Sequence, residues 1–141
     1  MTDTRQILIE RYGGANTLKV SQDHQEDPLG PDDVRIQVAF SGINFADIQM
    51  RLGFYPDAPK RPFVPGYEVS GTVEAVGEAV EGISVGQDVV AGTYFGGYAS
   101  CVTVPSRQVL CLPKGMGLKE GAALPVNFFT AHLALVDMAR V

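Results

Sequence analysis

Short segments of alternating apolar and polar residues, separated by glycine and proline, are the feature that most limits the folds open to this chain. Val34, Ile36 and Val38 alternate with Arg35 and Gln37, and a period of two predicts a strand with one buried face. The 16 glycines and 9 prolines separate such segments, as expected for turns. These patterns predict strands at 6–10, 18–22, 34–40, 67–76, 87–91, 98–104 and 108–112. So many short strands predict a mainly β chain, built as a partly open antiparallel β-barrel.

A short helix is inserted among these strands. Phe45, Ile48 and Leu52 lie three and four residues apart, which predicts an amphipathic helix from the first of them to the last. Asn44 precedes it as an N-cap, and Gly53 ends it. The prolines that follow predict a long irregular loop, and such loops in compact domains are often functional.

The last segment, 118–141, has helical rather than strand periodicity. Its apolar residues, among them Leu124, Phe128 and Leu135, recur at helical spacings. Because proline breaks or kinks a helix, we predict a short helix, a bend at Pro125–Val126, and a longer helix to the end of the chain. The apolar face of this C-terminal helical arm predicts contact with a surface outside the chain.

Composition excludes several classes of protein. The 141 residues are a one-domain length, and the net charge of −5 argues against a nucleic-acid partner, which usually needs a basic face. No apolar run is long enough for a membrane span, and the N-terminus lacks the apolar stretch of a signal peptide. The two cysteines do not make a disulfide framework. We therefore predict a reduced, cytoplasmic protein.

Polar side chains occur at three junctions of the predicted elements. Asn44 and Asp47 stand three apart at the start of the inserted helix, and Asn127 and Thr130 stand three apart at the start of the long one. Each pair is compatible with a ligand bound at a helix N-terminus. The simpler interpretation is that each pair caps its helix. Glu68 follows a Pro-Gly turn near a strand start. It is either an exposed edge residue or a buried carboxylate, which would need a partner.

Together these junctions carry a family resemblance. Gly-Ile-Asn-Phe-Ala-Asp at 42–47 and Pro-Gly-Tyr-Glu at 65–68 are joined by matching stretches at 51–55, 85–89 and 122–130. From its first strand to its last residue the chain resembles the medium-chain dehydrogenase/reductase superfamily. Within that superfamily it is most similar to the zinc-free quinone oxidoreductase branch, which includes zeta-crystallin and the VAT-1-like proteins.

The resemblance implies that residues 1–141 form a GroES-like catalytic domain and that a Rossmann nucleotide-binding domain lies outside this chain. Such a domain needs a glycine-rich turn between a strand and a helix. The chain contains no G-x-G-x-x-G, and the glycines at 115, 117 and 121 have the wrong spacing. By itself the chain is therefore expected to be inactive. The full-length protein is expected to be a homodimer.

The resemblance also bears on zinc. Where zinc-dependent relatives carry cysteine and histidine ligands, this chain has Asn44 and Tyr67, which are poor zinc ligands. Of that ligand set only Glu68 remains, and His24 and His132 are isolated in the sequence. We predict that the protein holds no zinc.

In the zinc-free branch, the positions that match five residues of this chain line the cleft around the nicotinamide of NADPH: Asn44, Asp47, Tyr55, Asn127 and Thr130. Tyr67 and Glu68 are expected behind that cleft. The implied cofactor-binding residues are Asn44, Asp47, Tyr67, Asn127 and Thr130, and the implied catalytic residues are Asn44 and Tyr55. The implied reaction is hydride transfer from NADPH to a quinone or an α,β-unsaturated carbonyl, whose oxygen needs hydrogen-bond donors as it becomes negative.

Two other interpretations stay open. The barrel could be a non-catalytic module that acts in protein–protein interaction through its apolar helix, because a fold does not determine a function. Convergence of Asn44, Tyr55 and Asn127 on one cleft would favour the enzyme over this module. A zinc alcohol dehydrogenase is a third interpretation, which stoichiometric zinc would support.

Overall fold

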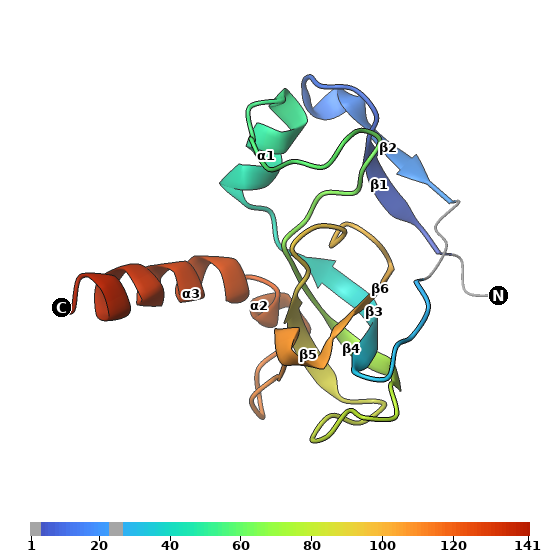
Figure 1. Cartoon of the computed structure of the whole chain (residues 1–141), viewed down its shortest axis with the longest axis vertical. Helices are drawn as coiled ribbons and strands as arrows, with labels where there is room; N and C mark the ends of the chain where they lie inside the picture. Colours follow the sequence, from blue (N-terminus) through green and yellow to red (C-terminus); the bar gives the residue numbers. More distant parts are fainter. Residues whose placement is uncertain (1–3, 23–26) are drawn as a thin grey trace.

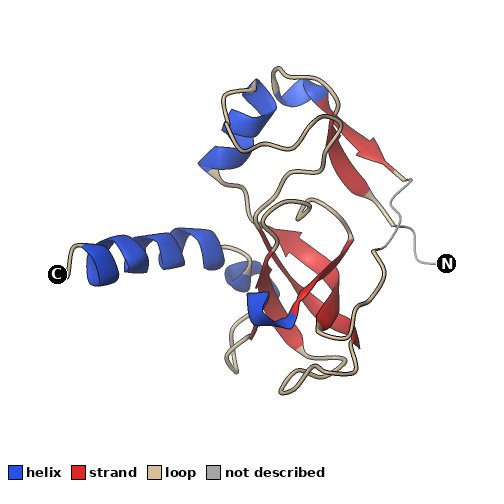
Figure 2. Cartoon of the chain, viewed as in Figure 1, coloured by secondary structure: helices blue, strands red, loops and turns tan. Residues whose placement is uncertain are grey.

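A computed structural model describes residues 4–22 and 27–141 of the chain. The five-stranded sheet and its connections form the lower layer in Figure 1, and a two-stranded hairpin with one helix lies above it. Figure 2 shows that loops make up much of the upper layer. The strands are β1 (Gln6–Ile9), β2 (Leu18–Ser21), β3 (Asp33–Ser41), β4 (Glu68–Val76), β5 (Asp88–Gly92), β6 (Cys101–Pro105) and β7 (Val109–Cys111). The helices are α1 (Phe45–Leu52), α2 (Leu118–Gly121) and α3 (Pro125–His132), with 3₁₀ turns η1 (Ala15–Thr17) and η2 (Ser106–Gln108) and a π-helical segment η3 (Leu133–Met138).

The large sheet has the strand order β6-β3-β4-β5-β7, and every pairing in it is antiparallel. The pairing of β3 with β4 shifts register twice, between Arg35 and Ile36 and between Val38 and Phe40. Such irregularities bend a strand and increase its twist, so they help the sheet to curl. The prediction of a mainly β, GroES-like partly open barrel is confirmed.

The main core is formed by apolar side chains of the large sheet. Val34 and Ile36 of β3 and Val69 and Val73 of β4 are at most 2% exposed. Their spacing of two or four residues confirms the predicted alternation. The first half of β4, however, is buried on both faces, because Ser70 Oγ donates a hydrogen bond to the carbonyl of Leu118 in α2. The terminal helices therefore cover a face that alternation alone would leave to solvent.

One predicted strand begins later than expected. The pattern at 98–104 predicts a strand from Tyr98, but β6 begins at Cys101. The preceding residues pair with the segment at β1, since Ile7 donates to the carbonyl of Tyr98 and Ser100 to that of Arg5, while Val38 of β3 still donates to the carbonyl of Ser100. Residues 98–100 thus connect the two sheets.

Helix α1 has the bounds that its apolar spacing predicts. Gly53 ends it in a left-handed conformation with φ 83°, which a residue without Cβ adopts readily. Met50 is fully buried beside Ile9 and Phe63, and these three form a second small core between α1 and the hairpin. The upper layer therefore has apolar packing of its own.

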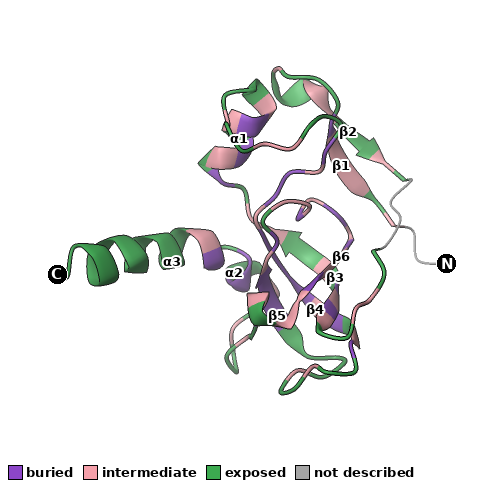
Figure 3. Ribbon diagram, in the orientation of Figure 1, coloured by how far each residue is buried: buried purple, intermediate pink, exposed green. Residues whose placement is uncertain are grey.

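The C-terminal arm differs from its prediction in one respect. Pro125 is the first residue of α3 and does not bend a helix from within, because the chain already turns between Gly121 and Pro125. The first turn of a helix tolerates proline well, since its missing N–H would have no partner there. The arm then extends away from the barrel, and it is almost entirely exposed beyond Pro125 (Figure 3).

Two further expectations concern cysteines and membranes. Neither of the two described cysteines is in a disulfide, and Cys101 is buried whereas Cys111 is exposed. In the described residues no helix combines the length and apolarity that a membrane crossing requires. His24, an isolated histidine in the sequence, lies outside the residues that the structure describes.

Candidate functional site

Three polar side chains are buried where β3, β4 and α1 meet. Asn44, Asp47 and Glu68 are 7%, 5% and 1% exposed. Polar groups at such depth cost free energy unless they are hydrogen-bonded. We call these three residues the polar junction.

Asp47 holds the start of α1. One of its carboxylate oxygens accepts the backbone N–H of Asn44 at 2.8 Å, and the other accepts the N–H of Gly66 at 3.0 Å. Burial raises the pKa of the Asp47 carboxyl above its ordinary value, while these two backbone hydrogen bonds oppose the rise. The capping role foreseen for Asp47 is therefore real, and Asp47 also ties the proline-rich segment that ends at Gly66 to α1.

Glu68 joins three elements of the fold. Its Oε1 accepts Asn44 Nδ2 at 2.8 Å, and its Oε2 accepts the backbone N–H of Val126 at 2.7 Å, in the first turn of α3. Negative charge at a helix N-terminus is favourable. Of the two alternatives for Glu68, the buried and partnered carboxylate is confirmed, and the exposed edge residue is excluded.

Gly42 makes room for this carboxylate. A Cβ at position 42 would collide with the Glu68 carboxylate, so a side chain there would force the junction to move. The glycine of the 42–47 motif is thus explained by close approach to Glu68, 26 positions along the chain.

Tyr67 lies at the centre of an aromatic group beside the junction. Its ring centroid is 6.2 Å from that of Tyr55, 6.5 Å from that of Tyr94 and 5.5 Å from that of Phe95. Burial, together with the neighbouring Tyr55, raises the pKa of Tyr67 above its ordinary value, so the phenol is neutral at physiological pH and can donate a hydrogen bond.

A cavity of about 460 Å³ lies between this aromatic group and α3, and we call it the α3 cavity. Tyr67 and Thr130, two predicted cofactor-binding residues, line it together. Asn127 is exposed on α3 and is not among the lining residues, and neither is Tyr55. The structure therefore brings Asn44, Asp47 and Glu68 together at the junction, and Tyr67 and Thr130 together at the cavity. Asn127, which is exposed on α3, directly follows Val126 but does not itself line the α3 cavity.

Two residues of the α3 cavity, Tyr94 and Arg107, carry no signal in the sequence that predicts a site. Tyr94 has a left-handed backbone, φ 56°, which is uncommon for a residue with a side chain. Arg107 lies on η2, far along the chain from the other motifs. Neither residue belongs to a recognisable local pattern, so only the fold could bring them to the cavity.

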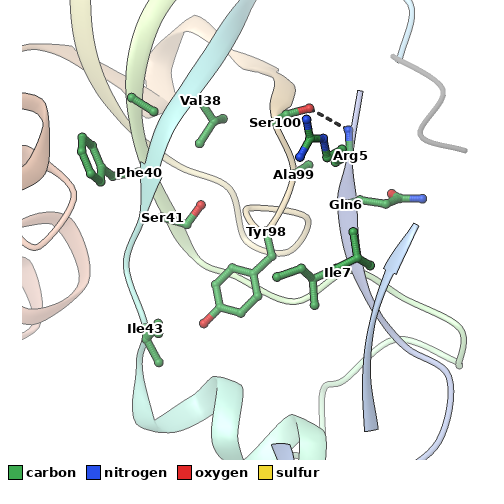
Figure 4. A pocket seen from close by; sticks show the side chains of 12 residues that line it. Arg5, Gln6, Ile7, Val38, Phe40, Ser41, Ile43, Tyr98, Ala99 and Ser100 are labelled. Atoms are coloured by element: carbon green, nitrogen blue, oxygen red, sulfur yellow. Dashed lines mark hydrogen bonds between the residues drawn. The ribbon is translucent and has the colours of Figure 1, made fainter. Parts of the chain in front are cut away.

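A second cavity, also about 460 Å³, lies between the end of β3 and β1. Figure 4 shows Tyr98, Ser41, Ile43 and Ile7 around it, with Ser100 Oγ accepting the backbone N–H of Arg5. The buried Tyr98 hydroxyl forms no hydrogen bond with any described residue. Burial, and next the charge of Asp47, raises the pKa of Tyr98. Tyr98 thus lines this cavity and also lies within the influence of the polar junction.

At the positions of the zinc ligands, Asn44 and Tyr67 offer an amide and a phenol, and neither is a good zinc ligand. Within residues 4–22 and 27–141, no three His, Cys, Asp or Glu side chains come together as a metal would require. That the protein holds no zinc stays a prediction.

Comparison with known proteins is consistent with this architecture. Residues 30–114 match the model of the alcohol dehydrogenase GroES-like domain. A quinone oxidoreductase of Lama guanicoe is 35% identical over 136 residues, covering 96% of this chain and 41% of that protein. This chain belongs to the quinone oxidoreductase branch of the medium-chain dehydrogenase/reductase superfamily. The chain spans only 28–41% of the length of its VAT-1 and quinone oxidoreductase relatives.

Solved structures agree with this assignment. The human synaptic vesicle membrane protein VAT-1 homolog-like protein superposes with a TM-score of 0.93 at 34% identity, over 98% of this chain and 44% of that one. The Escherichia coli quinone oxidoreductase complexed with NADPH superposes with a TM-score of 0.86 at 26% identity, over 96% and 41%. The GroES-like domain therefore shares its fold with a protein that binds NADPH.

Proposed function

We propose that this GroES-like domain is the substrate-side part of an NADPH-dependent reductase that transfers hydride to a quinone or an α,β-unsaturated carbonyl without zinc. The observation that carries the proposal is the bond from Glu68 to both Asn44 and the start of α3. It holds the polar junction against the helix that forms one wall of the α3 cavity. A site for a polar, planar ligand needs such a fixed set of donors beside an aromatic wall.

The proposed reaction requires hydrogen-bond donors from the protein. A quinone or enone that accepts hydride develops negative charge on its oxygen, which positioned donors stabilise. The candidates are the second N–H of the Asn44 amide and the hydroxyls of Tyr55 and Thr130. Bound NADPH would supply the hydride, and water can supply the proton. No single side chain is required as a general acid.

The residues proposed to hold the nicotinamide end of NADPH are Asn44, Asp47, Tyr67, Asn127 and Thr130. The structure supports direct contact best for Tyr67 and Thr130, which line one cavity with a neutral phenol and a hydroxyl. Asp47 has both carboxylate oxygens bonded to backbone N–H groups, so its role is to hold α1. Asn127 is exposed and free to meet a ligand that extends along α3.

The rest of the nucleotide site is proposed to belong to a Rossmann domain outside these 141 residues. The chain spans 28–41% of the length of its VAT-1 and quinone oxidoreductase relatives, which supports this division. The full-length protein is proposed to be cytoplasmic and a homodimer, as the sequence analysis expects.

A second function has one observation in its favour. Large apolar side chains on the arm are exposed, including Phe128 at 63% and Met138 at 74%, and such a face suits a protein partner. Convergence of Asn44, Tyr55 and Asn127 would have argued against a pure interaction module. Because Asn127 does not line the α3 cavity, the enzyme proposal relies on Glu68, Tyr67 and Thr130.

The test is NADPH-dependent reduction of a quinone and of an enone by the full-length protein, with metal content measured on the same sample. We expect turnover of at least one substrate without stoichiometric zinc. Asn44→Ala should lower kcat roughly 100-fold if its amide serves the developing oxyanion. Exposed Asn16→Ala is the control. Absence of turnover in a sample that binds NADPH would refute the reductase, and one zinc per chain would favour the alcohol dehydrogenase instead.

A further inference from the structure

The α3 cavity contains a charged side chain that the proposed reaction does not use. Arg107 lines the cavity together with Tyr67, Tyr94, Gln108, Phe129 and Thr130. It is the one charged residue among all those that line this cavity, and no aspartate or glutamate is found among them. The chain as a whole carries a net charge of −5. The lining of this cavity is therefore positively charged, although the chain as a whole is negatively charged.

The guanidinium of Arg107 is also available for binding. In the described part of the chain its guanidinium forms no hydrogen bond and no ion pair. Other arginines have partners: Arg51 donates to the carbonyl of Gly13, Arg35 donates to Thr103, and Arg61 lies 4.0 Å above the ring of Tyr12. The donors of Arg107 are thus available to a ligand.

The backbone that carries Arg107 is held in place. It belongs to η2, whose Ser106 N–H donates to the carbonyl of Asp32 at 2.9 Å. Directly after η2, Val109 begins β7 and pairs with Ala91 of β5. The backbone at Arg107 is thus anchored on both sides, so the side chain starts from a fixed point beside the cavity.

The other walls suit an apolar or aromatic ligand. Tyr67, Tyr94 and Phe129 present rings, and Thr130 presents a hydroxyl. A flat ring system fits between aromatic side chains, and a guanidinium at the edge binds carboxylate with two parallel hydrogen bonds. The cavity therefore combines a surface for a ring with a cation for an anionic substituent.

We propose that Arg107 binds a carboxylate carried by the substrate, so that the preferred substrates are quinones or enones bearing an anionic group away from the bond that is reduced. This inference rests on the reductase function proposed above. It adds a substrate class to that function, and it makes Arg107 a specificity-determining residue outside the donors that serve the reacting oxygen.

The experiment compares a naphthoquinone that carries a short carboxylic acid chain with the methyl ester of the same compound. The two differ in charge and hardly in shape. With the full-length protein and saturating NADPH, kcat/KM should favour the acid roughly tenfold at low ionic strength. Since Arg107 is exposed, added salt should reduce this preference without changing the rate for the ester.

Variants locate the effect. Arg107→Gln should abolish the preference for the acid and leave the ester unchanged, while Arg107→Lys should retain part of it, because lysine keeps the charge without the planar fork. Arg61→Gln is the matched control: it removes the same charge from an exposed arginine outside the α3 cavity. It should leave the preference intact.

Three results would overturn the inference. The wild-type protein could reduce the acid and ester equally, Arg107→Gln could slow both alike, or Arg107→Gln could weaken NADPH binding while the acid preference persists. The last result would assign Arg107 to a phosphate of the dinucleotide. If neither compound is reduced, the reductase proposal fails. Calorimetric binding of the acid and the ester to wild type and Arg107→Gln then tests the anion site separately.

Discussion

Two pairs of residues with the same local pattern end in opposite environments. Asn44 and Asp47, and likewise Asn127 and Thr130, stand three apart at the start of a helix. The first pair is buried and bonded within the polar junction, whereas the second is exposed. The difference comes from Glu68, which reaches the Asn44 side chain but meets α3 only through the backbone N–H of Val126. Spacing at a helix start therefore does not reveal whether a polar pair is structural or available to a ligand.

Removal of Glu68 should disturb the buried pair most. Glu68→Ala leaves Asn44 Nδ2 and the Val126 N–H without their acceptor, so we expect the free energy of unfolding to fall by about 3 kcal/mol. Chemical denaturation measures this change. Glu78→Ala, an exposed carboxylate two positions after the end of β4, should change it by less than about 0.5 kcal/mol. Equal losses in the free energy of unfolding would show that the buried Glu68 stabilises the fold no more than an exposed glutamate does.

A side chain at Gly42 tests the same junction by crowding it. Gly42→Ala brings a Cβ into the Glu68 carboxylate, and we expect a loss of about 2 kcal/mol in the free energy of unfolding. At Gly92 a Cβ would meet only ordinary contact, 3.9 Å from the carbonyl oxygen of Tyr67, so Gly92→Ala is the control. A neutral Gly42→Ala would mean that Glu68 moves easily, and the comparison between the two pairs would weaken.

The dependence of stability on pH sharpens the comparison further. Burial raises the pKa of Asp47 in the folded protein above its unfolded value of 3.8. A raised pKa favours folding of the protonated form, so this contribution is present below the unfolded pKa and is lost as pH rises through the folded pKa. The stability of the wild type relative to Asp47→Asn should therefore fall as pH rises through the mildly acid range. A difference that instead grows with pH would show that the two backbone hydrogen bonds outweigh burial.

The exposed pair should be the least sensitive to mutation. Asn127→Ala removes no hydrogen bond within the described structure, so unfolding should change by less than about 0.5 kcal/mol. If the proposed function holds, the same variant should weaken NADPH binding in the full-length protein. Titration of NADPH, together with denaturation, separates the two effects. A large loss of stability would place Asn127 with the structural residues.

Much of the local structure follows from local signals. Helix α1 has its predicted bounds, because apolar spacing, an N-cap residue and a terminal glycine all act within one short segment. Several strands end within one residue of their prediction, since alternation is also a local property. The family resemblance, carried by the same segments, is confirmed by the matching domain model and solved structures.

Other features depended on partners far along the chain. The late start of β6 follows from pairing with β1, and the burial of both faces of β4 follows from packing against α2. Glu68 finds its partners 24 and 58 positions away. No local pattern could choose between its exposed and buried alternatives.

The sequence by itself determined which segments become strands or helices and which family the chain belongs to, because propensity, alternation and motif spacing act over a few residues. Only the tertiary structure decided which polar residues are buried, which face a cavity, and that Arg107 joins Tyr67 and Thr130 there. Burial and convergence depend on how distant segments pack, and the free energy of a polar group depends on the neighbours that packing supplies.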